Sequence, residues 1–141
     1  MSNIIPNINK REPMGLNKNG EPFRILVVDD STVMRKIVTQ ILRSEAFEVV
    51  AEASNGEESI ELYKKFKPDI VTMDVNMPLM DGLTALKRIL ETDSAARVVM
   101  LTSESEQKMV LEAIQSGAKN YVVKPPDRQL LLEKVKASLS K

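Results

Sequence analysis

Five side chains with reactive or charged groups stand directly after apolar segments: Asp29 and Asp30 after residues 25–28, Asp74 after 69–73, Thr102 after 97–101 and Lys124 after 120–123. Two adjacent carboxylates about 4 Å apart repel each other by roughly 4 kcal/mol at an effective dielectric constant of about 20, so Asp29 and Asp30 require a cation or a chemical role. Three carboxylates form an all-oxygen site that suits Mg²⁺, and Mn²⁺ could also fill it. Together with a hydroxyl and an ammonium group, they meet the needs of phosphoryl transfer, which are positioning and neutralisation of charge.

Asp74 is the strongest nucleophile candidate, because in the chain it lies between the acid pair and the residues Thr102 and Lys124. Taken singly, these residues have ordinary structural explanations. An Asp pair can form a turn and a helix cap, Thr102 can cap the next helix, and Lys124 can be a solvated side chain. Their joint occurrence at four predicted strand ends favours a functional site.

The segments between these residues predict a doubly wound α/β fold with three layers. Short apolar runs alternate with amphipathic stretches, which is the pattern of repeated strand and helix units around a parallel sheet; the predicted strands are residues 25–28, 47–53, 69–73, 97–101 and 120–123. Right-handed crossovers place the carboxyl ends of parallel strands at one edge of the sheet. If the strands take the order 2-1-3-4-5 of known flavodoxin-like folds, the carboxylates after the first and third strands converge.

The predicted helices carry start and stop signals. Ser31 or Thr32 is expected to cap the first helix, and Asn55 and Glu58 have the spacing of a capping box at the start of the second. Gly117 is a suitable residue to end the fourth helix.

Composition limits the chemistry and the partners of the chain. Its 141 residues, 43% of them hydrophobic, are enough for the core of one ordinary domain. Lys plus Arg equal Asp plus Glu at 20 each, which argues against nucleic acid as a direct partner. The sequence contains no cysteine and no histidine, which excludes disulfides, thiolate or imidazole metal ligands and Ser-His relays. It also lacks a long apolar run and a signal-peptide core, so we expect a cytoplasmic protein without membrane insertion.

Residues 1–22 differ in character from the rest of the chain. They contain prolines at positions 6, 13 and 22 and show no sustained helix or strand period, so we interpret them as a flexible N-terminal tail. Residues 23–141 are then expected to form the single domain.

Four segments resemble a known family. The stretches ILVVDDS, DIVTMDVNMPLMDG, VVMLTSES and GAKNYVVKP, in this order and spacing, are similar to those of response-regulator receiver domains, and the resemblance covers residues 23–141. Because no effector domain follows the last predicted helix, the chain resembles the single-domain chemotaxis regulators of that family. The resemblance implies a phosphorylation-activated switch of a two-component system and not an enzyme, although such a domain catalyses its own phosphorylation and dephosphorylation.

The resemblance implies a role for each residue of the candidate site. Asp74 would accept a phosphoryl group from the phosphohistidine of a sensor kinase. Asp30 and Asp74 would bind Mg²⁺ together with the backbone carbonyl of Asn76, and Asp29 would act mainly through a coordinated water. Lys124 would pair with the phosphoryl oxygens.

Switching and signal lifetime are implied to depend on further positions. Thr102 would move to hydrogen-bond the phosphoryl group, and Tyr121 would turn inward with it, although a half-buried strand tyrosine explains Tyr121 equally well. Asn76 and Glu104 would flank the water that removes the phosphoryl group and would so tune its lifetime.

The resemblance also implies a cis peptide bond between Lys124 and Pro125, where base rates alone predict trans. Pro126 is a departure, since the family commonly has phenylalanine there. This change affects the start of the last helix and the usual output surface, which consists of the fourth helix, the fifth strand and the fifth helix. The implied partners are a sensor histidine kinase, the flagellar motor switch protein and a phosphatase.

Three alternatives remain open at the level of sequence. A phosphorelay intermediate would pass the phosphoryl group to another histidine protein. An aspartate-nucleophile phosphatase of the haloacid-dehalogenase type would have a second aspartate at the position of Asn76. A flavodoxin-like FMN carrier would have a hydroxyl-rich phosphate loop after the first strand, and the sequence contains no tryptophan.

Overall fold

The computed structural model describes residues 12–140, with all side chains except that of Glu104. The strands are β1 (Arg24–Val28), β2 (Glu48–Ala53), β3 (Ile70–Asp74), β4 (Val98–Thr102) and β5 (Asn120–Val123). The helices are α1 (Thr32–Arg43), α2 (Gly56–Phe66), α3 (Gly82–Thr92), α4 (Gln107–Ser116) and α5 (Arg128–Leu139), and a short 3-10 helix at Glu104–Glu106 precedes α4. Among these described helices, none has the length and apolar character needed to cross a membrane.

The strands form one parallel sheet in the order β2-β1-β3-β4-β5, which confirms the predicted fold class and strand order. Val28 pairs with Met73, so Asp29, which follows the last residue of β1, lies next to Asp74, the last residue of β3. Farther along the sheet, Thr102 is paired with the last residue of β5. The register therefore delivers every predicted strand-end side chain to one edge of the sheet.

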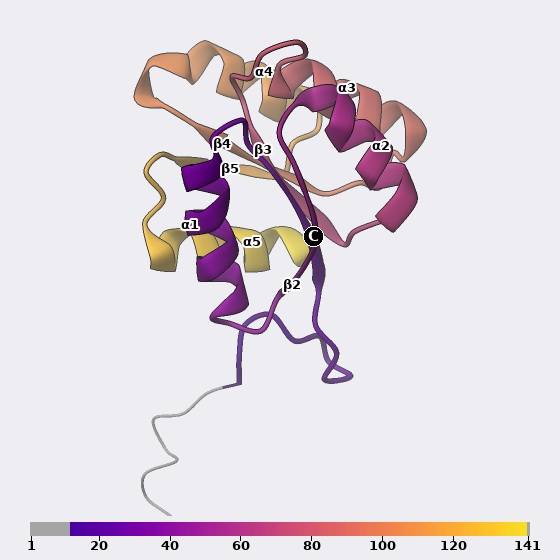
Figure 1. Ribbon diagram of the computed structural model, residues 1–141, viewed down its shortest axis with the longest axis vertical. Coiled ribbons are helices and arrows are strands. Elements are labelled where there is room, and N and C mark those ends of the chain that lie inside the picture. Colours follow the sequence, from indigo (N-terminus) through magenta and orange to yellow (C-terminus); the bar gives the residue numbers. More distant parts are fainter. Residues whose placement is uncertain (1–11, 141) are drawn as a thin grey trace, which may run out of the picture.

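Alternation of side chains along the strands builds a core on each face of the sheet. Leu26 and Val28 face one core with α2, α3 and α4, whereas Ile25 and Val27 face the other with α1 and α5. Figure 1 shows the helices α1 and α5 on one side of the sheet and the other three on the opposite side. Because helices cover both faces, the central strands are apolar at nearly every position.

Helix caps agree largely with the sequence signals. Of the two predicted caps for α1, Ser31 accepts a hydrogen bond from the first turn. Asn55 caps α2 by accepting from the N–H of Glu58, at 2.9 Å. The Glu58 carboxylate reaches back to the N–H of Ser54, at 2.7 Å, one residue beyond the position that a standard capping box uses. Gly117 ends α4 with a φ of 121°, a conformation that glycine adopts without strain.

Residues 12–22, here called the N-terminal strap, pack against the domain. The N–H of Gly15 donates to the carbonyl of Glu45 and the N–H of Phe23 donates to the carbonyl of Gly15, both at 2.7 Å. Lys136 of α5 donates to the carbonyl of Met14 at 3.0 Å. A Cβ at Gly15 would collide with the backbone after Glu45, so glycine permits this close approach. In this structure residues 12–22 are therefore held against the domain by hydrogen bonds. The flexible tail predicted for residues 1–22 stays a prediction, and residues 1–11 lie outside the described residues.

Candidate functional site

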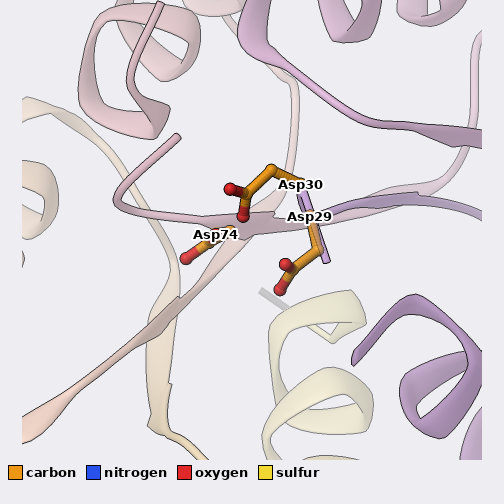
Figure 2. A group of neighbouring side chains, drawn as sticks. All are labelled: Asp29, Asp30 and Asp74. Atoms are coloured by element: carbon orange, nitrogen blue, oxygen red, sulfur yellow. The ribbon is translucent and has the colours of Figure 1, made fainter. Parts of the chain in front are cut away.

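The ends of β1 and β3 bring three carboxylates together. One carboxylate oxygen from each of Asp29, Asp30 and Asp74 lies within 4.8 Å of the other two. Figure 2 shows the three side chains grouped at the edge of the sheet. Asp29 and Asp74 are buried and Asp30 is exposed. An all-oxygen group with one side open to solvent fits the preference of Mg²⁺, which keeps several waters and binds only one or two carboxylates directly.

Lys124 lies against the two buried carboxylates. Its Nζ is 2.8 Å from Oδ2 of Asp29 and 2.9 Å from Oδ1 of Asp74. Burial alone would lower the pKa of Lys124, but hydrogen bonds and charge from both aspartates outweigh that effect, so its pKa lies above the usual value. The ammonium group is thus the cation that lets two acids lie side by side in the folded protein.

Asp74 is electrostatically unusual. Its burial raises the pKa of Asp74 to about 6, although the hydrogen bond and charge of Lys124 lower it. The neighbouring Asp29 charge raises it further, and the N–H of Asn76 lowers it. A carboxylate that is desolvated in this way gains strongly from a nearby cation, so its nucleophilic form depends on the charge around it.

The turns after β1 and β3 hold the acids in place. The N–H of Ser31 donates to Oδ1 of Asp29 at 2.9 Å, which fixes the carboxylate within its own turn. After β3, the N–H of Gly82 donates to the carbonyl of Val75 at 2.8 Å. A Cβ at Gly82 would collide with the carbonyl oxygen of Asp74, so the start of α3 can lie this close only with glycine.

Thr102 and Tyr121 have orientations that differ from the implied signalling positions. The Thr102 hydroxyl is 3.1 Å from the carbonyl oxygen of Ser103 and 3.3 Å from Oε1 of Glu106, both in the loop after β4. The Tyr121 side chain is 42% exposed, and Nζ of Lys134 lies 5.8 Å from the centre of its ring. In this structure the hydroxyl is engaged in the loop and the ring faces outward.

Of the two residues predicted to tune the lifetime of the phosphoryl group, the structure describes Asn76 fully and Glu104 only by its backbone. Asn76 is exposed in the loop after β3, two residues beyond Asp74, and its N–H lies 3.4 Å from Oδ1 of Asp74. The backbone of Glu104 begins the 3-10 helix after β4, and its side chain is the one that the structure leaves undescribed.

The turn after β5 confirms one expectation. The peptide bond between Lys124 and Pro125 is cis, as the resemblance implied. Beyond Pro126, Asp127 caps α5 by accepting a hydrogen bond from the first turn, and the helix begins at Arg128. The proline that departs from the family pattern is therefore compatible with a normally capped α5.

Sequence reasoning missed two residues of this edge. Arg35 of α1 donates to the carbonyl of Asp29 at 2.6 Å and to Glu52 of β2 at 3.2 Å, and so ties the acid pair to the edge strand. Glu106 accepts from the backbone of Ser103 at 3.0 Å. The S-x-x-E spacing of a capping box could have revealed Glu106. No local pattern points to Arg35, because its contact with Glu52 forms only when α1 packs against β2.

We expect the free energy of unfolding of the protein, measured with a chelator present, to fall as pH rises from about 4 to about 6. The folded-state pKa of Asp74 is raised from 3.8 to about 6, so the folded protein binds this proton more tightly than the unfolded chain does. That stabilisation is complete below the unfolded pKa, is lost through the folded pKa and is worth at most about 3 kcal/mol.

The comparison for this pH effect is Asp74→Asn, whose neutral side chain has nearly the same shape. Urea denaturation of both proteins from pH 4 to pH 8 gives the difference in stability, which should shift in favour of the asparagine variant as pH rises. A difference that stays constant over this range would contradict the raised pKa.

Comparison with known proteins identifies the family. The sequence model of the response regulator receiver domain family matches residues 25–136, and the chain belongs to this family. It is a receiver domain of the two-component regulatory systems, whose domains are phosphoacceptor switches rather than enzymes in the usual sense. This membership decides against the phosphatase and FMN-carrier alternatives.

The relatives narrow the class to CheY-like domains. The chemotaxis protein CheY of Treponema pallidum is 48% identical over 136 residues, covering 95% of this chain and 94% of that protein. The chemotaxis protein CheY of Bacillus subtilis is 49% identical over 117 residues, covering 83% of this chain and 98% of that protein. A chain of the CheX-CheY-BeF3-Mg+2 complex from Borrelia burgdorferi is 41% identical with a TM-score of 0.88, covering 93% of this chain and 100% of that one.

Proposed function

We propose that this protein is a chemotaxis response regulator that a histidine kinase activates by phosphorylating Asp74. The observation that carries the proposal is that Asp74 lies close to two further carboxylates and to Lys124, whose Nζ is 2.9 Å from Oδ1 of Asp74. Such a site offers a nucleophile, oxygen ligands for a divalent cation and a fixed positive charge within a few ångströms.

In the proposed reaction, a carboxylate oxygen of Asp74 forms a bond to phosphorus while the bond from phosphorus to the donor's imidazole nitrogen breaks. The electron pair of the broken bond leaves with the imidazole, which takes a proton from solvent. Mg²⁺ held by Asp30, Asp74 and the carbonyl of Asn76 would neutralise charge on the phosphoryl oxygens. Lys124 would exchange its contact with the Asp74 carboxylate for one with a phosphoryl oxygen.

Signalling would pass from the site to the surface through Thr102 and Tyr121. A hydrogen bond from the Thr102 hydroxyl to the phosphoryl group would draw the threonine toward Asp74, and Tyr121 would turn into the space behind it. Tyr121 borders an open groove of about 540 Å³ between α4 and β5, which apolar side chains such as Leu111 and Ile114 also line. Inward movement of the ring would reshape this groove and change its affinity for partner proteins.

The proposed partners follow from the relatives. The matched proteins of T. pallidum and B. subtilis are chemotaxis proteins, which supports a chemotaxis kinase as the donor and the flagellar motor switch as the target. The Borrelia burgdorferi structure is a complex with CheX, which supports a phosphatase as a further partner.

The test of the proposal is phosphotransfer from a histidine. A chemotaxis histidine kinase is labelled with [γ-³²P]ATP, freed of nucleotide and mixed with this protein and Mg²⁺. Label should move to this chain within seconds and should be released by hydroxylamine, as expected for an acyl phosphate. If the label stays on the kinase while the same chain accepts phosphate from acetyl phosphate, the proposed class of donor is wrong.

The lifetime of the phosphorylated state is a separate prediction. Asn76 and Glu104 can orient the water that attacks phosphorus opposite the Asp74 oxygen, whereas bulky or cationic side chains would obstruct it. We expect the double variant Asn76→Arg/Glu104→Tyr to lose its phosphate about tenfold more slowly, equivalent to roughly 1.4 kcal/mol of barrier. Phosphate release after removal of the donor measures the rate. Glu112→Tyr on α4 serves as the control with unchanged decay, and an unchanged rate in the double variant would remove both residues from this role.

A further inference from the structure

Glu106 contacts Thr102, the threonine that would bind the phosphoryl group in the proposed function. Its Oε1 accepts a hydrogen bond from the backbone N–H of Ser103 at 3.0 Å, and the Thr102 hydroxyl lies 3.3 Å from the same oxygen. Glu106 ends the 3-10 helix after β4, so the loop folds its carboxylate back over the end of the strand. One carboxylate oxygen thus joins the backbone of the loop to the side chain of Thr102.

The Thr102 hydroxyl has a single hydrogen to donate. Both acceptors that the structure places near it belong to the loop, namely Oε1 of Glu106 and, at 3.1 Å, the carbonyl of Ser103. The carbonyl of Ser103 also accepts from the N–H of Glu106 at 3.1 Å, which closes the turn on itself. Thr102 is only 2% exposed, so water competes little for the hydrogen bond that its hydroxyl donates.

We propose that Glu106 is a positioning residue that holds the Thr102 hydroxyl in the loop after β4 and thereby opposes activation. The inference rests on the proposed function, in which that hydroxyl donates to a phosphoryl group on Asp74. Because the hydroxyl can donate to one acceptor at a time, it must leave the loop before it binds the phosphoryl group. A charged acceptor binds a hydroxyl more strongly than a neutral one, so the carboxylate makes this step harder.

The sign of the effect separates this role from a structural one. At 3.3 Å the contact between the Thr102 hydroxyl and Glu106 is long for an O–H donor, so we assign it the value of an ordinary hydrogen bond, whose loss changes an equilibrium by about fivefold. If Glu106 holds back Thr102, its removal should strengthen binding of a phosphoryl analogue by about that factor. If Glu106 only supports the start of α4, its removal should leave binding unchanged or weaken it.

The experiment titrates the wild-type protein and Glu106→Ala with beryllium trifluoride, a phosphoryl analogue, at saturating Mg²⁺, and follows binding by ¹⁹F NMR. Glu112→Ala is the matched control, because it removes a carboxylate from the following helix α4, where Glu112 pairs with Lys87 on the surface. We expect about fivefold tighter binding in Glu106→Ala and no change in Glu112→Ala. Equal or weaker binding in Glu106→Ala overturns the proposal.

A second measurement tests whether Glu106 acts through the hydroxyl or through its charge. In Thr102→Val, which lacks the hydroxyl but keeps the shape, adding Glu106→Ala should have no further effect on binding. A fivefold gain that persists in this background would mean that the carboxylate acts by long-range repulsion, and the proposal fails. Should Glu106→Ala prove unfolded in thermal denaturation, Glu106→Gln replaces it, with an expected gain of about twofold.

The controls separate this inference from the proposed function. If the wild-type protein does not bind beryllium trifluoride with Mg²⁺, or if Asp74→Asn binds it equally well, the phosphoacceptor site itself is wrong. If both behave as expected but Glu106→Ala does not bind more tightly, only the role of Glu106 is refuted.

Discussion

Replacing Asp74 with asparagine is expected to abolish phosphorylation by acetyl phosphate, with a fall in rate of at least about 1000-fold. The amide oxygen of asparagine is a far weaker nucleophile than a carboxylate, and a factor of this size corresponds to roughly 4 kcal/mol of barrier. Asp74 is buried at the end of β3, which lies between β1, the strand before the acid pair, and β4, the strand that ends at Thr102. Lys124 contacts its carboxylate. Mass spectrometry of the intact protein measures the result, as one added phosphate in the wild type.

The matched control for this substitution is Asp81→Asn. Asp81 caps the nearby helix α3 by accepting from the N–H of Thr84 at 2.8 Å, and asparagine is an equally good cap. This variant should take up phosphate like the wild type. One phosphate per chain in Asp74→Asn would show that a different residue is the acceptor.

Removal of Mg²⁺ by a chelator is expected to stop phosphorylation almost completely, because the attacking carboxylate and the phosphoryl oxygens then repel each other. The two adjacent acids should contribute unequally to the metal site. Asp29 is buried and already engaged by Lys124 at 2.8 Å and by the N–H of Ser31, whereas Asp30 is exposed beside Asp74. We therefore expect Asp30→Ala to weaken Mg²⁺ binding at least about tenfold, and more than Asp29→Ala does.

Titration calorimetry with Mg²⁺ alone compares the two variants with the wild type. Thermal unfolding is measured in parallel, since Asp29→Ala leaves Lys124 with one buried partner fewer and should cost more stability than Asp30→Ala. Equal losses of Mg²⁺ affinity would contradict the predicted difference between the two aspartates. A larger loss in Asp29→Ala would show that Asp29 is the direct ligand. Phosphorylation that continues unchanged in the presence of the chelator would remove the metal from the reaction.

The sequence by itself determined the alternation of strands and helices and the position of each candidate residue after a strand. These features are local: apolar runs form covered strands, and caps such as Ser31, Asn55 and Gly117 act within a few residues of their partners. The gathering of Asp29, Asp30 and Asp74 could also be predicted, because parallel strands end at one edge. Their convergence still required a strand order taken from known folds.

Only the tertiary structure decided which groups satisfy one another across that edge. Lys124 is in contact with Asp29, 95 positions earlier in the chain, and Arg35 joins the carbonyl of Asp29 to another strand. The strap similarly depends on Gly15 meeting the loop between α1 and β2. Such contacts arise when distant elements pack, and the free energy of burying a charge or a backbone group then selects its partner. Local periodicity contains no information about those distances, which is why the residues of the strap resemble a flexible tail in the sequence.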